Sequence, residues 1–134
     1  MTSKDSTGQR DGVPIREWYA AAERPKPIRD RFAKLEKLRD LGVPAYSYSF
    51  DPTDDLTSAL AAYEDGVEGT RVRVAGRLES LRDMGKSAFA HLGDRSGRLQ
   101  VYFRRDDLSE LERQVQNLLD LGDWIGVAGE LFRT

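Results

Sequence analysis

The feature that most constrains the fold of this chain is a run of three closely spaced segments in which apolar and polar residues alternate. They cover residues 70–82, 87–93 and 98–104. Because successive side chains of a β-strand point to opposite faces, the alternation predicts three strands that each turn one face toward a core. The short polar stretches 83–86 and 94–97 are typical of turns, so the strands are expected to follow one another as a meander.

A helix and a fourth strand are predicted to follow. Ser109 and Glu112 have the spacing of a capping box, which predicts a helix over 109–120. Alternation returns over 124–132 and predicts another strand. This order is that of the opening part of an OB-fold, a five-stranded Greek-key β-barrel. The predicted fold class is therefore mainly β with accessory helices, with the fifth strand of the barrel missing because it is expected after residue 134.

The segment before the barrel has the period of a helix. Its apolar residues recur every three or four positions, at Ile28, Phe32, Leu35, Leu38 and Leu41. This spacing predicts an N-terminal amphipathic helix over 28–41, with Pro27 in its first turn and Gly42 just after its end. A second, short helix is expected to be capped by Thr57 and to end near Tyr63.

We expect three parts along the chain. Residues 1–26 are predicted to be a flexible N-terminal tail, within which 15–23 are compatible with a short helix. Residues 27–66 form a helical N-terminal extension in this interpretation, and 67–134 form the incomplete OB-fold.

Composition excludes several classes of protein. Hydrophobic residues make up 39% of the chain and charged residues 33%, which is typical of a globular protein with a modest core. No apolar run approaches the roughly 18 residues of a membrane span, and the first twelve residues lack the apolar region of a signal peptide. The absence of cysteine excludes disulfides and thiolate metal sites and fits a cytoplasmic location. A single histidine, His91, does not make a metal site.

The charges are segregated along the chain although the net charge is only −2. Residues 68–105 carry nine basic and four acidic side chains, whereas 106–123 carry six acidic side chains and one basic. A local basic surface attracts phosphate whatever the total charge is, so the distribution is compatible with nucleic-acid binding. The alternative is that the basic residues of 68–105 simply form an ordinary solvated strand face.

Simple alternation places a mixture of side chains on the face of the second and third strands that lies opposite the core. Phe89 offers a ring on which a base can stack, and Gln100 offers both a donor and acceptors to a base edge. Lys86 in the first turn suits a phosphate. The candidate binding residues are Arg82, Lys86, Phe89, His91, Gln100 and Tyr102.

Each candidate also has a structural interpretation. Phe89 belongs to the core if the strand parity is wrong by one residue, since phenylalanine is usually buried. Arg82 and Lys86 are then ordinary turn residues, and Tyr102 only covers the rim of the barrel. No catalytic residue is predicted, because the chain has no glycine-rich phosphate loop, no Ser/His/Asp arrangement and no Cys/His pair.

Two long segments strongly resemble the anticodon-binding domain of class II lysyl-tRNA synthetases. They run from 76 to 108 and from 119 to 134, and 31–50 resembles the segment that these enzymes place before the barrel. Aspartyl- and asparaginyl-tRNA synthetases share the barrel but usually lack a leading helix followed by the pattern seen here at Gly42, Tyr46 and Phe50.

The resemblance implies that the ligand is the anticodon loop of lysine tRNA. Phe89 takes the position of the family's phenylalanine that stacks on the central anticodon uridine. Arg82 and Gln100 take the positions of the arginine and glutamine that help to recognise the same base. A further family glutamate is expected just beyond Thr134.

The resemblance also limits what this chain is expected to do. The three class II signature motifs, which bind ATP and lysine, are not in the sequence. We therefore expect a fragment that is not itself an enzyme, with ATP and Mg²⁺ implied only for the missing catalytic domain and a homodimer implied only for the full-length protein. Two alternatives stay open: a protein-interaction or dimerisation module built on an OB-fold, and the equivalent domain of an aspartyl- or asparaginyl-tRNA synthetase. The joint presence of Arg82, Phe89 and Gln100 favours tRNA binding.

Overall fold

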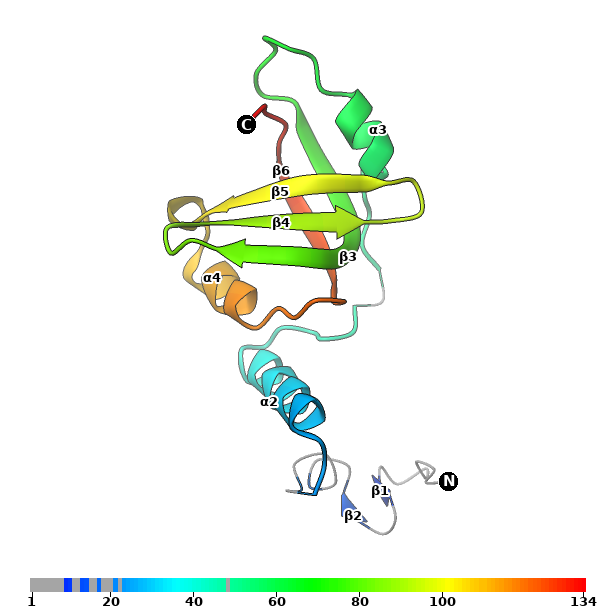
Figure 1. The fold of residues 1–134 in the computed structure, drawn as a ribbon, viewed down its shortest axis with the longest axis vertical. Coiled ribbons are helices and arrows are strands. Elements are labelled where there is room, and N and C mark those ends of the chain that lie inside the picture. Colours follow the sequence, from blue (N-terminus) through cyan, green and yellow to red (C-terminus); the bar gives the residue numbers. More distant parts are fainter. Residues whose placement is uncertain (1–8, 11–12, 15–16, 18–20, 22, 48) are drawn as a thin grey trace. The chain divides into compact units, whose positions relative to one another are not determined.

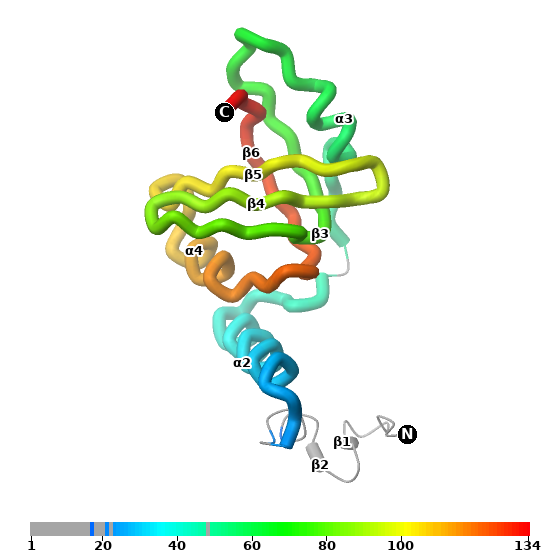
Figure 2. The backbone as a smooth tube through the Cα atoms, viewed as in Figure 1, coloured from blue at the N-terminus to red at the C-terminus, as the bar shows by residue number. Residues whose placement is uncertain are grey.

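The computed structural model describes residues 9–10, 13–14, 17, 21, 23–47 and 49–134 of the 134-residue chain. The chain divides into two compact units, Met1–Tyr46 and Ser47–Thr134, which we describe separately. Figure 2 traces the backbone of both. Most of the predicted tail, and most of the helix considered over 15–23, lie outside the described residues.

The first unit contains one long helix, α2, which spans Lys26–Asp40. Proline is common in the first turn of a helix, and Pro27 is the second residue of α2, just after the N-cap Pro25. Gly42 ends the helix with a φ of +75°, a conformation that suits glycine. The predicted helix over 28–41 is thus confirmed with slightly shifted ends. Two short strands, β1 (Gln9–Arg10) and β2 (Val13–Pro14), pair antiparallel before it.

The second unit is built on a four-stranded antiparallel sheet in the order β5-β4-β3-β6 (Figure 1). The strands span Arg71–Asp83 (β3), Ser87–Gly93 (β4), Arg98–Arg104 (β5) and Trp124–Glu130 (β6). The 13-residue β3 pairs with β6 along its first half and with β4 along its second half. This curled half-barrel confirms the predicted OB-fold, although β6 ends two residues before the predicted end at 132.

Gly76 lies at the point where β3 passes from one partner strand to the other. A Cβ atom at this position would lie 3.0 Å from both the carbonyl oxygen of Gly93 and the Cβ of Leu92. The close approach explains why glycine interrupts the alternation here, since any side chain would force the two strands apart.

The core lies on one face of the sheet and is capped by a short helix. Its buried side chains come from β3, β4, β5 and the helix α3, and they are Leu56, Ala59, Val72, Val74, Leu78, Ala90, Leu92 and Val101. Helix α3 spans Leu56–Ala61, so it is shorter than predicted. Its N-cap is Asp55 and not Thr57, because the Asp55 carboxylate accepts the backbone N–H of Ser58 at 2.7 Å. This corrects the prediction for Thr57, whose hydroxyl instead donates to the Ser96 carbonyl oxygen at 2.6 Å.

Between β5 and β6 the chain forms the 3₁₀ turn η1 (Arg105–Asp107) and helix α4 (Glu110–Asn117). The capping box is confirmed: the Ser109 hydroxyl accepts the Glu112 N–H at 3.1 Å, and the Glu112 carboxylate accepts the Ser109 N–H at 2.9 Å. The helix is shorter than the predicted 109–120. In the described part of the chain, no helix has the length and apolar character needed to cross a membrane.

Candidate nucleic-acid interface

The candidate surface is the outer face of β3, β4 and β5, opposite the core. Its centre is a row of three directly paired residues, in which Arg82 of β3 faces Phe89 of β4 and Phe89 faces Tyr102 of β5. The neighbours of Phe89 along its strand, Ala88 and Ala90, are fully buried on the other face. Phe89 is therefore on the outer face, as the alternation predicted.

A β-bulge between Leu78 and Ser80 brings Arg82 into this row. Uninterrupted alternation from the buried Val74 and Leu78 would turn Arg82 toward the core. The bulge inserts one extra residue, so Leu81 packs against the core and Arg82 moves to the outer face. The bulge therefore determines whether this cation lies beside Phe89.

The two rings of the row are in contact. The ring centroids of Phe89 and Tyr102 are 4.8 Å apart and their planes are inclined at 34°. Both residues are half-buried, so part of each ring remains accessible. Together they form an aromatic surface on a strand face, the kind of surface on which unpaired bases stack.

A second row, beside the first, is polar. Ser80, His91 and Gln100 lie opposite one another on β3, β4 and β5. The Ser80 hydroxyl and the Nδ1 atom of His91 are hydrogen-bonded at 2.8 Å. This bond fixes the orientation of the half-buried imidazole and leaves its Nε2 atom for another partner. Gln100 is exposed, so its amide is accessible for donating and accepting hydrogen bonds.

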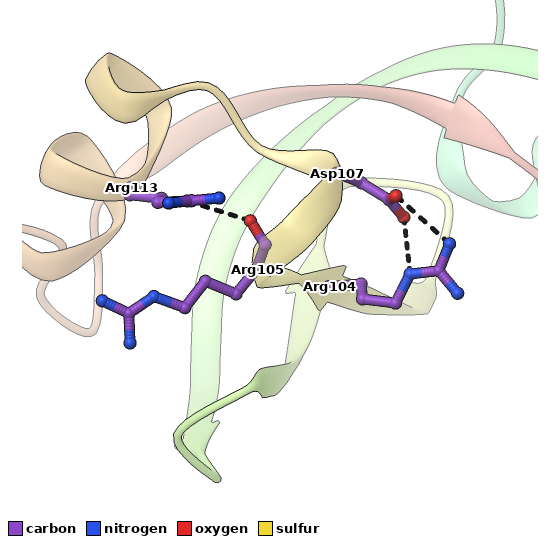
Figure 3. Close-up of polar contacts among 4 residues, drawn as sticks. All are labelled: Arg104, Arg105, Asp107 and Arg113. Carbon is purple, nitrogen blue, oxygen red and sulfur yellow. Dashed lines mark hydrogen bonds and ion pairs between the residues drawn. The ribbon is translucent and has the colours of Figure 1, made fainter.

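Three of the six arginines in β3 and β5 are already paired with acids. Ion pairs join Arg71 to Glu130 at 3.1 Å and Arg98 to Glu79 at 2.5 Å. Arg104 makes two hydrogen bonds to Asp107, at 2.9 and 3.1 Å (Figure 3). The hydrogen bonds and charge of this carboxylate raise the pKa of Arg104 above its ordinary value.

Arg82 and Lys86 differ from these arginines. Both are exposed, and neither side chain makes a hydrogen bond or an ion pair with any residue in the described part of the chain. Lys86 lies in the turn between β3 and β4, which is held by a bond from the Met84 N–H to the Ser87 carbonyl oxygen at 2.8 Å. Neither cation therefore has an acidic partner among the described residues; Arg82 lies in the aromatic row and Lys86 lies at the nearest turn.

The structure thus brings together Arg82, Phe89 and Tyr102 in one row and His91 and Gln100 in the next, with Lys86 at the adjoining turn. Sequence analysis missed two residues of this surface. One is Ser80, which the bulge turns toward His91. The other is Phe132, whose ring meets that of Tyr102 edge to face with centroids 5.8 Å apart. The alternation of β6 indicated the outward direction of Phe132 but not its partner.

Comparison with known proteins identifies the domain. Residues 72–134 match the family of OB-fold nucleic acid binding domains of the tRNA anticodon type. The chain is 44% identical over 107 residues to Lysine–tRNA ligase 2 of Methanosarcina mazei, an alignment that covers 78% of this chain and 21% of the relative. It is 36% identical over 117 residues to Lysine–tRNA ligase of Thermoanaerobacter pseudethanolicus, covering 87% of this chain and 23% of the relative.

The chain therefore spans about a fifth of the length of the curated relatives it matches. The fold, the order of strands and the matched residues agree on one assignment. Residues 72–134 are therefore an OB-fold anticodon-binding domain, and the chain matches part of lysine–tRNA ligases.

Proposed function

We propose that this chain binds the anticodon loop of lysine tRNA and that Phe89 stacks on the central anticodon uridine. The observation that carries the proposal is the row of Arg82, Phe89 and Tyr102, in which a cation without an acidic partner among the described residues flanks two rings in contact. Binding of single-stranded nucleic acid depends on this combination of π surface and positive charge.

The polar residues supply the rest of the recognition. Gln100 lies on β5, the strand next to that of Phe89. Its amide donates to and accepts from the edge of the stacked base. Arg82 approaches the same base from the opposite side, and His91 and Tyr102 line the face between them. Lys86 contacts a phosphate of the loop, where a compact ammonium group suffices.

Lysine tRNA is the proposed partner because the relatives that the chain matches are lysine–tRNA ligases. We assign tRNA binding in the cytoplasm to this chain, and we assign it no reaction and no cofactor. Aminoacylation with ATP, and the dimer of the longer protein, are proposed only for a longer chain that includes such a domain.

The test is a fluorescence-anisotropy titration of the 134-residue chain with the anticodon stem-loop of lysine tRNA. A matched RNA differs only by cytidine at the central anticodon position. We expect the uridine RNA to bind about tenfold more tightly or better, since a well-placed set of base contacts contributes roughly 1–3 kcal/mol of discrimination. Equal affinity for the two RNAs would contradict recognition of the central base, and absence of binding to either would contradict tRNA binding itself.

A further inference from the structure

Phe132 extends the aromatic row beyond the strands that form it. It follows β6 by two residues, and its ring contacts that of Tyr102, which in turn contacts Phe89. The side chain is exposed over 56% of its surface. The ring therefore offers an accessible aromatic face beside Tyr102.

The contact between Phe132 and Tyr102 depends on the curl of the sheet. In the sheet order, β5 and β6 are the two opposite edges, separated by β4 and β3. The ring of Tyr102 on β5 nevertheless contacts the ring of Phe132, in the segment that follows β6. Figure 1 shows this red C-terminal segment near β5. Phe132 therefore reaches the candidate surface from outside the three strands that carry it.

Both neighbours of Phe132 are attached to the segment before β3. The N–H of Leu131 donates to the carbonyl oxygen of Thr70 at 2.9 Å, and Leu131 packs against the core. On the other side, the Arg133 guanidinium is paired with Asp65 at 3.0 Å. The ring is thus presented by a segment tied to the residues just before β3, which reduces the conformational cost of ordering it on a ligand.

We infer that Phe132 is a second stacking position, which takes the anticodon base next to the one on Phe89. The inference rests on the proposed function. Because the two centroid distances are 4.8 and 5.8 Å, the rings of Phe89 and Phe132 are no farther apart than their sum. Bases stacked along one strand are about 3.4 Å apart, so Phe132 lies near enough to Phe89 to receive a base close to the one stacked there.

The competing explanation is that Phe132 only covers Tyr102. Three substitutions separate the two roles. Phe132→Tyr keeps an aromatic face, Phe132→Leu keeps an apolar cover without a π face, and Phe132→Ala removes both. Phe89→Ala serves as the reference for the proposed function, because it acts on the neighbouring base.

The experiment uses lysine anticodon stem-loops with 2-aminopurine at one or the other position beside the central uridine, titrated with the 134-residue chain. The fluorescence of this base falls when it stacks on a ring. We expect the unmodified chain and Phe132→Tyr to quench one of the two probes. Phe132→Ala and Phe132→Leu lose that quenching and bind about tenfold more weakly, equivalent to about 1.4 kcal/mol.

Unchanged quenching of both probes by Phe132→Ala would overturn the inference. Full affinity and quenching by Phe132→Leu would overturn it too, because an apolar side chain without a π face would then suffice and Phe132 would only cover Tyr102. If Phe132→Ala fails to fold, as judged by its melting temperature, the tyrosine and leucine variants decide the question. If Phe89→Ala weakens RNA binding but Phe132→Ala changes neither binding nor quenching, the second stacking position is refuted and the proposed function stands. An effect of Phe132→Ala without one of Phe89→Ala supports it and refutes the central-base role of Phe89.

Discussion

Phe89 and Tyr102 lie directly opposite each other on β4 and β5, with their ring centroids 4.8 Å apart. Cross-strand aromatic pairs at this distance stabilise a sheet by roughly 0.5–1.5 kcal/mol beyond the burial of their surface. The same pair is the centre of the proposed binding face. Its contributions to stability and to binding therefore have to be measured separately.

Phe89→Ala is expected to weaken binding of the lysine anticodon stem-loop by about ten- to a hundredfold. Base–aromatic stacking contributes roughly 1–3 kcal/mol by alanine substitution, and each factor of ten corresponds to about 1.4 kcal/mol. The affinity is measured by anisotropy, and urea unfolding of the same protein reports any loss of stability.

The matched control is Phe89→Leu, which keeps most of the apolar contact with Tyr102 but has no π face. Phe89→Leu should fold nearly as well as the original chain and bind almost as weakly as Phe89→Ala. If it binds with the original affinity, the ring contributes apolar area and does not stack on a base.

Lys86→Ala and Gln100→Ala are expected to weaken binding in different ways. Lys86 is proposed to contact a phosphate, so its loss should weaken binding to uridine and cytidine stem-loops alike and reduce the slope of log K against log salt by about 0.7. Gln100→Ala should mainly reduce the preference for uridine. Titrations of both RNAs at several salt concentrations measure the two effects.

Other results would contradict the roles proposed for Gln100 and Lys86. A glutamine variant that loses affinity equally for both RNAs does not recognise a base, and a lysine variant with an unchanged salt slope makes no phosphate contact. Arg104→Ala is a useful control, because the charge of Arg104 is already paired with Asp107. Its salt slope should change less than that of Lys86→Ala.

Ser80→Ala is expected to weaken RNA binding about two- to tenfold through His91. The hydroxyl of Ser80 holds Nδ1 of His91 at 2.8 Å, and one hydrogen bond contributes roughly 0.5–1.5 kcal/mol. The measurement is a double-mutant cycle with His91→Ala. Since the serine acts through the histidine in this account, Ser80→Ala should have little further effect once His91 is gone. Effects that simply add would show that the two residues act independently.

The strands of this face were predictable because their pattern is local. β4 and β5 match the predicted segments residue for residue, since alternation and the turns at 83–86 and 94–97 depend only on neighbouring residues. The same holds for the capping box at Ser109 and Glu112. The Thr57 prediction was wrong because Asp55, two residues earlier, is an equally suitable N-cap, and its carboxylate accepts the Ser58 N–H.

Other parts of the candidate surface depend on contacts between distant residues. The bulge at Leu78–Ser80 depends on pairing with β4, and its sign in the sequence of β3 is slight: the apolar Leu78 and Leu81 are three residues apart, an odd spacing in an otherwise even pattern. The contact of Phe132 with Tyr102 depends on how far the sheet curls. The sequence therefore predicted which side chains of β4 and β5 face away from the core, but it did not indicate that Ser80 and Phe132 belong to the same surface.

Asp94 provides a test of stability against pH. One oxygen of its carboxylate accepts the N–H of Leu56 at 2.9 Å, and the other accepts the N–H groups of Ser96 at 2.7 Å and Gly97 at 3.1 Å. Burial alone would raise the pKa of Asp94, but the hydrogen bonds from Ser96, Leu56 and Gly97 outweigh it and lower the pKa below its ordinary value. The carboxylate thus ties helix α3 to the turn between β4 and β5.

Because the pKa of Asp94 is lower in the folded chain than in the unfolded one, its contribution to stability is complete above the unfolded value of about 4 and is lost as the pH falls below it. Asp94→Ala should therefore lower the free energy of unfolding by about 1–2 kcal/mol at pH 7, where the loss of charged hydrogen bonds is felt in full. The difference from the original chain should shrink steadily as the pH falls below about 4. Asp51→Asn is the control, since the exposed Asp51 carboxylate makes no hydrogen bond with the described residues. Urea unfolding at pH 7, 4 and 3 measures all three proteins. A difference between Asp94→Ala and the original chain that stays the same at every pH would mean that Asp94 acts by packing, and that its charge does not hold α3 in place.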